Sequence, residues 1–158
     1  MKMNMKMILV LSFIFGGFIA RAGHPDMNKI RDLFAVSSTD EEACNELYKL
    51  TSSYSLQNFP VYYAYNAAAE MTLANHTYWP NEKLSLFNAG KERLEEAVSK
   101  QPNTVEIRFI RYCVQQGCPF FLDYDDNLAE DKKFILGNLS KSGWSETYQK
   151  EVKDFLNS

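Results

Sequence analysis

The sequence predicts an all-α protein of about seven helices, two of them short. After residue 22, apolar residues recur at three- and four-residue steps, which is the spacing of one helix face. The clearest case is the last stretch, with Tyr148, Val152, Phe155 and Leu156. No stretch of useful length alternates between apolar and polar residues, as a half-buried strand would.

Each expected helix begins where a side chain can satisfy the free N–H groups of the first turn. Capping boxes, in which Ser, Thr or Asn precedes Glu by three residues, occur at Thr39, Asn103 and Asn127. Prolines, which the first turn tolerates, support two further starts. We therefore expect helices to begin near Pro25–Asp26, Thr39, Asn58, Asn81, Asn103, Asn127 and Ser145. Between two of them, Phe120–Leu122 is expected to form an apolar loop that packs back onto the core.

Residues 1–22 have the three parts of a cleavable signal peptide. Lys2 and Lys6 precede the apolar run Met7–Ala20, and Ala20-Arg21-Ala22 matches the small-x-small pattern of a cleavage site. The run is shorter than the roughly 20 residues of a membrane span, although an uncleaved anchor is the alternative. We therefore expect an exported single helical domain at residues 23–158, with no membrane insertion after cleavage.

The charge of the mature chain restricts its partners. Three of the 17 Lys and Arg residues and none of the 20 Asp and Glu residues lie in 1–22, which leaves a net charge of −6. An acidic chain is a poor match for nucleic acid or for an anionic membrane surface. A protein partner is the remaining expectation.

Three cysteines make disulfide formation a question in an exported protein. Cys113 and Cys118 lie close enough in sequence for a local bridge at a helix end, whereas Cys44 is distant. The alternative is three buried, inert thiols. Spacing alone leaves both interpretations open.

The segment Gly90–Pro102 resembles the second helix of a tetratricopeptide repeat. Gly90 and Ala97 are the small residues that admit a neighbouring helix, Leu94 fills the groove between them, and Pro102 blocks continuation. The first half of the repeat departs from the pattern, because the bulky, Leu-Gly and Tyr positions hold Ala74, Thr77, Tyr78 and Asn81. The resemblance covers one degenerate repeat and implies an antiparallel array of helix hairpins.

Seven segments between Tyr62 and Leu139 carry a second resemblance: 67–71, 83–84, 87–91, 94–97, 105–111, 119–122 and 131–135. In these segments the chain resembles a group of uncharacterised exported helical bacterial proteins. It implies a periplasmic or outer-envelope location in a Gram-negative bacterium and supplies no activity.

The acidic segment from Asp123 suggests a calcium loop that fails on inspection. Asp123, Asp125 and Asn127 fit its first ligands, but Leu128 and Phe134 occupy the positions of the required Gly and bidentate Glu. An acidic turn before a helix N-terminus explains the segment. We therefore predict no metal site, no cofactor and no catalytic residues.

Five residues are candidates for binding a partner. Arg108 and Arg111 lie three apart on an apolar helix, where they either pair with Glu70, Asp125 or Asp131 or form an anion site. Tyr65, Tyr78 and Trp79 belong to an aromatic cluster of the kind that is enriched in binding hot spots.

These observations favour a non-catalytic protein–protein interaction module of the cell envelope. The alternatives are an envelope enzyme that uses acids near Asp123–Asp131 and a structural assembly subunit. A groove lined by Tyr and Arg would favour binding, whereas a deep pocket with two carboxylates of perturbed pKa would favour catalysis.

Overall fold

The computed structural model describes residues 23–158, so the predicted signal peptide lies outside the described residues. This part of the chain holds seven α-helices and no strand, which confirms the all-α prediction. None of these helices combines the length and apolarity that crossing a bilayer requires. The helices are α1 (Met27–Val36), α2 (Glu41–Thr51), α3 (Pro60–Leu73), α4 (Pro80–Lys100), α5 (Val105–Gly117), α6 (Leu128–Asn138) and α7 (Glu146–Asn157), with 3₁₀ turns η1 (Phe120–Leu122) and η2 (Leu139–Lys141).

Several helix starts lie where the sequence predicts them. Asp26 and Ser145 accept hydrogen bonds from first-turn N–H groups of α1 and α7. Pro60 and Pro80 are the first residues of α3 and α4, where the missing N–H leaves no intrahelical bond unmade. These four residues explain why the helices begin where they do.

The predicted capping boxes are wrong in detail. Asp40, and not Thr39, caps α2, and its carboxylate accepts from the Ala43 N–H at 3.0 Å. The residue before α5 is Thr104 instead of Asn103, and its side chain makes no capping bond. Likewise, the residue before α3 is Phe59 instead of the predicted Asn58.

At α5 and α6 the Glu residues of the predicted boxes bind arginines far away in the sequence. Glu106 pairs with Arg31, and Glu130 pairs with Arg108. Asn127 does precede α6, but its side chain bonds with Gln115. Each carboxylate binds an arginine instead of a backbone N–H, because a hydrogen bond between two charged groups is stronger.

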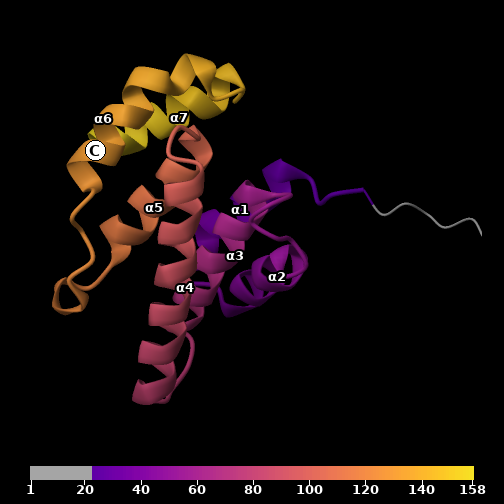
Figure 1. Cartoon of the computed structure of the whole chain (residues 1–158), viewed down its shortest axis with the longest axis vertical. Coiled ribbons are helices and arrows are strands. Elements are labelled where there is room, and N and C mark those ends of the chain that lie inside the picture. Colours follow the sequence, from indigo (N-terminus) through magenta and orange to yellow (C-terminus); the bar gives the residue numbers. More distant parts are fainter. Residues whose placement is uncertain (1–22) are drawn as a thin grey trace, which may run out of the picture.

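Consecutive helices from α1 to α6 contact one another, and α3 also contacts α1 and α5. Figure 1 shows α4 as the longest helix, with α3 beside it and α6 and α7 gathered at one end of the molecule. An array of helix pairs would make contacts of this kind. The tetratricopeptide-like arrangement itself stays a prediction.

Two apolar clusters form the core, and α5 belongs to both. Ile107 and Ile110 of α5 join the larger cluster, which α1 to α4 supply for the most part. Phe109 and Tyr112 of α5 join the second cluster, with side chains of α6 and α7. One helix therefore connects the two halves of the core.

The close approach of α3 and α4 depends on Gly90. A Cβ atom at this position would lie 2.4 Å from the Met71 Cγ and 2.5 Å from the Ala67 carbonyl oxygen. Ala97, two turns further on, is fully buried. The expectation that small residues at these positions admit a neighbouring helix is confirmed.

The Phe120–Leu122 segment is not the core-packing loop that its composition suggests. It forms η1, in which Phe120 and Phe121 are 92% and 70% exposed and Leu122 alone packs against the core. Asp123 follows in a left-handed conformation with φ of 49°. A turn this short directs one of its three side chains inward and leaves two in solvent.

Gly90→Ala should lower the free energy of unfolding by about 1 to 3 kcal/mol, because the new methyl group overlaps backbone as well as side-chain atoms of α3. Gly137→Ala in α6 is the matched control, since nothing lies within 4 Å of its added Cβ. The control should be neutral or stabilising by up to about 1 kcal/mol. Urea titration compares the two; equal effects would contradict the packing of α3 against α4.

Candidate functional site

Helix α5 carries three charged residues, Glu106, Arg108 and Arg111, that are all buried. A buried charge is stable only when opposite charges and hydrogen bonds replace the water it has lost. Each of the three finds such partners on other helices. The arrangement of these partners determines which faces of the molecule are left for binding.

Glu106 is the acceptor for three surrounding elements. Arg31 of α1 binds it through two nitrogens, at 2.9 and 2.6 Å. The Tyr65 hydroxyl of α3 and the Trp144 indole N–H, just before α7, each donate to it at 2.5 Å. The Arg31 guanidinium also lies over the Tyr148 ring of α7, 4.9 Å from its centroid. One carboxylate thus links α1, α3 and the start of α7 to α5.

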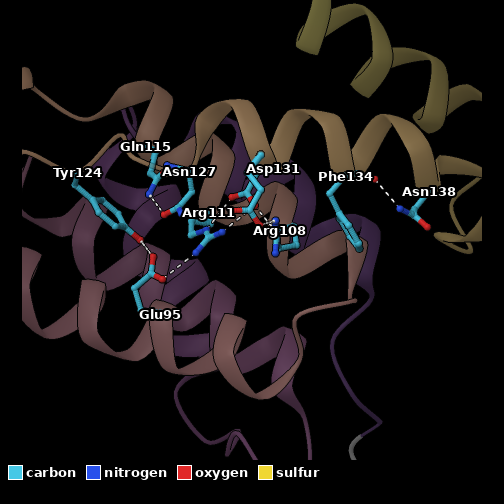
Figure 2. A network of polar contacts seen from close by, with 10 residues as sticks. Glu95, Arg108, Arg111, Gln115, Tyr124, Asn127, Asp131, Phe134 and Asn138 are labelled. Atoms are coloured by element: carbon cyan, nitrogen blue, oxygen red, sulfur yellow. Dashed lines mark hydrogen bonds and ion pairs between the residues drawn. The ribbon is translucent and has the colours of Figure 1, made fainter.

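Arg108 and Arg111 make a second network on the side of α5 that faces α4 and α6 (Figure 2). Arg111 binds both oxygens of the buried Asp131, at 2.8 and 2.9 Å, and reaches Glu95 at 2.9 Å. Arg108 pairs with the same Asp131 and with the exposed Glu130. Burial opposes the charge of Arg111, but its hydrogen bonds to Asp131 outweigh this effect and raise its pKa.

Of the predicted partner-binding residues, three are interior and two are on the surface. Tyr65, Arg108 and Arg111 are buried and bonded within the chain, so they support the fold and have no surface to offer a partner. Tyr78 and Trp79 are 84% and 66% exposed, in the connection before α4. They remain candidates for a contact.

The structure selects among the pairs predicted for the two arginines. Asp131 is the common partner, as one of the three alternatives proposed. Glu70 pairs with Arg93 instead, and Asp125 is exposed. Pairing within the chain therefore describes this site, and an anion site does not.

The three thiols are unbridged in the structure; Cys44 is buried, whereas Cys113 and Cys118 are only partly buried. Burial raises the pKa of Cys113 to about 12 and that of Cys44 to about 11. The pKa of Cys118 is also raised by burial. At neutral pH the thiols stay protonated, which makes them weak nucleophiles.

The main candidate site is an apolar groove of about 990 Å³. Its walls come from α1, the ends of α3 and η1, the start of α4, and from α5 and α7. Among the described residues, none from α2 or α6 lines it. Arg31, which binds Glu106, and Tyr148, whose ring contacts the Arg31 guanidinium, form part of its wall.

Exposed apolar side chains gather at this groove. Leu84, Phe121 and Phe155 are three of the large hydrophobic residues with substantial exposure, and all three line it. Trp79 directly precedes Pro80, which also lines the groove. Contiguous exposed apolar surface on a folded protein commonly marks a place of interaction.

The sequence-based prediction missed the groove. The one available signal was Phe155, an apolar residue at the edge of the buried stripe of α7 that remains partly exposed. The walls come together from segments far apart in the chain, so no local pattern could reveal the groove as a whole.

Three charged residues of the groove, Asp32, Glu151 and Lys83, are exposed. Within residues 23–158, none of them takes part in an ion pair. The acidic segment Asp123–Asp131, suggested as an active site, does not line the groove. Nor does the described part of the chain hold a cluster of three His, Cys, Asp or Glu residues suited to a metal ion.

Comparison with known proteins gives no match to a protein-family model, to a curated protein sequence or to a solved structure. The resemblances to tetratricopeptide repeats and to exported helical proteins therefore stay predictions.

Asp131→Asn should lower the free energy of unfolding by about 3 to 5 kcal/mol, because it leaves two buried guanidinium groups short of a charged partner. The adjacent Glu130→Gln is the matched control. Its side chain is largely exposed, so we expect a loss below about 1 kcal/mol. Chemical denaturation measures both; a mild effect of Asp131→Asn would contradict the structural importance of the network.

Stability should also fall as the pH rises above about 9. The folded state raises the pKa values of Cys113 and Cys44, and burial raises that of Tyr65 well above its ordinary value of 10.0. The unfolded chain then ionises first, the native state holds more protons, and the free energy of unfolding decreases with pH. Urea midpoints at about pH 8, 10 and 11 should decline steadily, and less steeply in Cys113→Ala. Constant midpoints would contradict the burial of these groups.

Proposed function

We propose that this chain is a non-catalytic protein-binding module of the bacterial cell envelope and that the groove receives its partner. The observation that carries the proposal is the apolar groove of about 990 Å³ with Leu84, Phe121 and Phe155 exposed along it. Burying these apolar side chains against a partner removes them from water, which stabilises the complex. Arg31 and Tyr148 add residue types that are enriched in the energetic centres of interfaces.

The distribution of the helices around the groove supports a tetratricopeptide-like role. The odd-numbered helices α1, α3, α5 and α7 all contribute to the walls, as does the start of α4, whereas α2 and α6 do not. A solenoid of helix pairs creates an extended concave surface in a comparable way. Burial of α5 between the two apolar clusters would keep such a surface rigid.

The alternative of an envelope enzyme is favoured by no specific observation. Asp131 is bound by two arginines, and Asp125 and Asp126 are exposed on the turn before α6. The two carboxylates of the groove, Asp32 and Glu151, are exposed on its α1 and α7 walls. Exposed acids without a buried partner are better suited to recognition than to proton transfer.

Selection of displayed random peptides on the purified protein tests the proposal. We expect the enriched peptides to lose binding at least tenfold when Ala35→Trp fills the groove from its α1 wall. Ala129→Trp is the matched control, because Ala129 is an exposed helical alanine of α6 outside the groove. Both variants should keep the wild-type unfolding midpoint, since both alanines are exposed.

If selection enriches no peptide, or if Ala129→Trp weakens binding as much as Ala35→Trp, the groove is not the binding surface and the proposal fails.

A further inference from the structure

We infer that the partner segment taken by the groove is an amphipathic helix with basic residues beside its apolar face. This inference rests on the proposed function and specifies its partner.

The apolar wall requires an apolar face on the occupant. Phe109 and Val114 of α5, Phe87 of α4 and Val152 of α7 line the groove, and the exposed Leu84 and Phe155 extend it towards solvent. Several bulky side chains of a partner, spaced along one face, would fill such a volume. Apolar anchors at helical spacing entering a hydrophobic groove are a recurring mode of peptide recognition.

The backbone of the occupant decides between a helix and an extended peptide. An extended peptide that binds by adding to a sheet satisfies its N–H and C=O groups at a strand edge, and residues 23–158 contain no strand. Unsatisfied backbone groups in an apolar groove would each cost free energy. A helix satisfies these groups internally and is therefore the segment that fits.

The exposed charges that line the groove indicate which charge the partner should carry. Asp32 on α1 and Glu151 on α7 are exposed, line the groove, and are without an ion-pair partner in the described chain. Asp32 adjoins Arg31 on α1, and Glu151 lies about one turn from Tyr148 on α7; Arg31 and Tyr148 contact each other. Arg31 itself is neutralised by Glu106. The unpaired charges on the α1 and α7 walls are therefore negative.

The same charge disfavours other occupants. The carboxylate of a fatty acid or the phosphate of a lipid headgroup would meet Asp32 and Glu151 at close range, where like charges repel. Lys83, which could attract an anion, lies on the first turn of α4, on a different wall. Lysine or arginine on the flank of a helix would instead pair with the two acids.

Two synthetic peptides test the inference. One is an amphipathic helix of leucine and lysine, about four turns long, and its twin has glutamate in place of every lysine. At about 0.15 M salt, fluorescence anisotropy should show the lysine peptide binding the purified protein at least tenfold more tightly than the twin. Circular dichroism should show helix forming on binding.

A charge-reversed pair of variants separates groove recognition from general attraction to an acidic protein. Asp32→Lys/Glu151→Lys should weaken binding of the lysine peptide about tenfold or more. Glu92→Lys/Asp126→Lys makes the same change in net charge at exposed acids outside the groove and should alter binding less than about twofold. Both acids of each pair are exposed, so both variants should fold.

Several results would overturn the inference. One is a lysine peptide that binds no more tightly than its twin, and another is a control variant that loses binding equally. Self-association through the groove, detected by sedimentation and abolished by Ala35→Trp, would assign the surface to a second copy. If selected peptides still depend on the groove, the proposed function survives these failures; if none does, both fall together.

Discussion

The burial of three charged side chains on α5 is the constraint on which the rest of the structure depends. Glu106, Arg108 and Arg111 are held away from water, where an unpaired charge would cost several kcal/mol. Their partners must therefore come from other helices. Arg31 and Tyr65 bind Glu106, while Asp131 binds both arginines. If α1, α3 or α6 shifted, a charged side chain of α5 would remain in the apolar interior without its partner.

This constraint also explains why a groove is present. One face of α5 is occupied by the pairs with α6, and its isoleucines pack into the larger apolar cluster. The remaining face carries Phe109, Cys113 and Val114, which line the groove. Because Glu106 binds Arg31 and Trp144, α1 and α7 stand beside this face as walls. The interior polar network therefore positions the apolar surface that we propose as functional.

Much of the fold follows from local sequence. Apolar periodicity predicts the seven helices, and Asp26, Pro60 and Ser145 start three of them, because caps and first-turn prolines act within a few residues. Gly90 also acts as predicted, since its small size matters for the neighbouring helix. The local capping rule is wrong at Glu106, because this side chain binds Arg31, 75 positions away in the chain, instead of a backbone N–H.

The candidate site was less predictable for the same physical reason. The sequence predicts Asp131 as one of three alternative partners of Arg111, but the burial of Tyr65 depends on the packing of three helices. Phe121 is apolar and yet exposed, because η1 is too short to turn all its side chains inward. The groove forms where α1, α5 and α7 come together with the ends of α3 and η1 and the start of α4, and no segment carries its pattern alone.

The most direct test of this account is hydrogen exchange of the protein with and without a groove-binding peptide from the display selection. The account predicts slower exchange in α1, in the second half of α5 and in α7, the helices that wall the groove. It predicts little change in α2 and α6. Protection concentrated in α2 or α6, with α1 and α7 unaffected, would contradict the assignment of the groove as the binding surface.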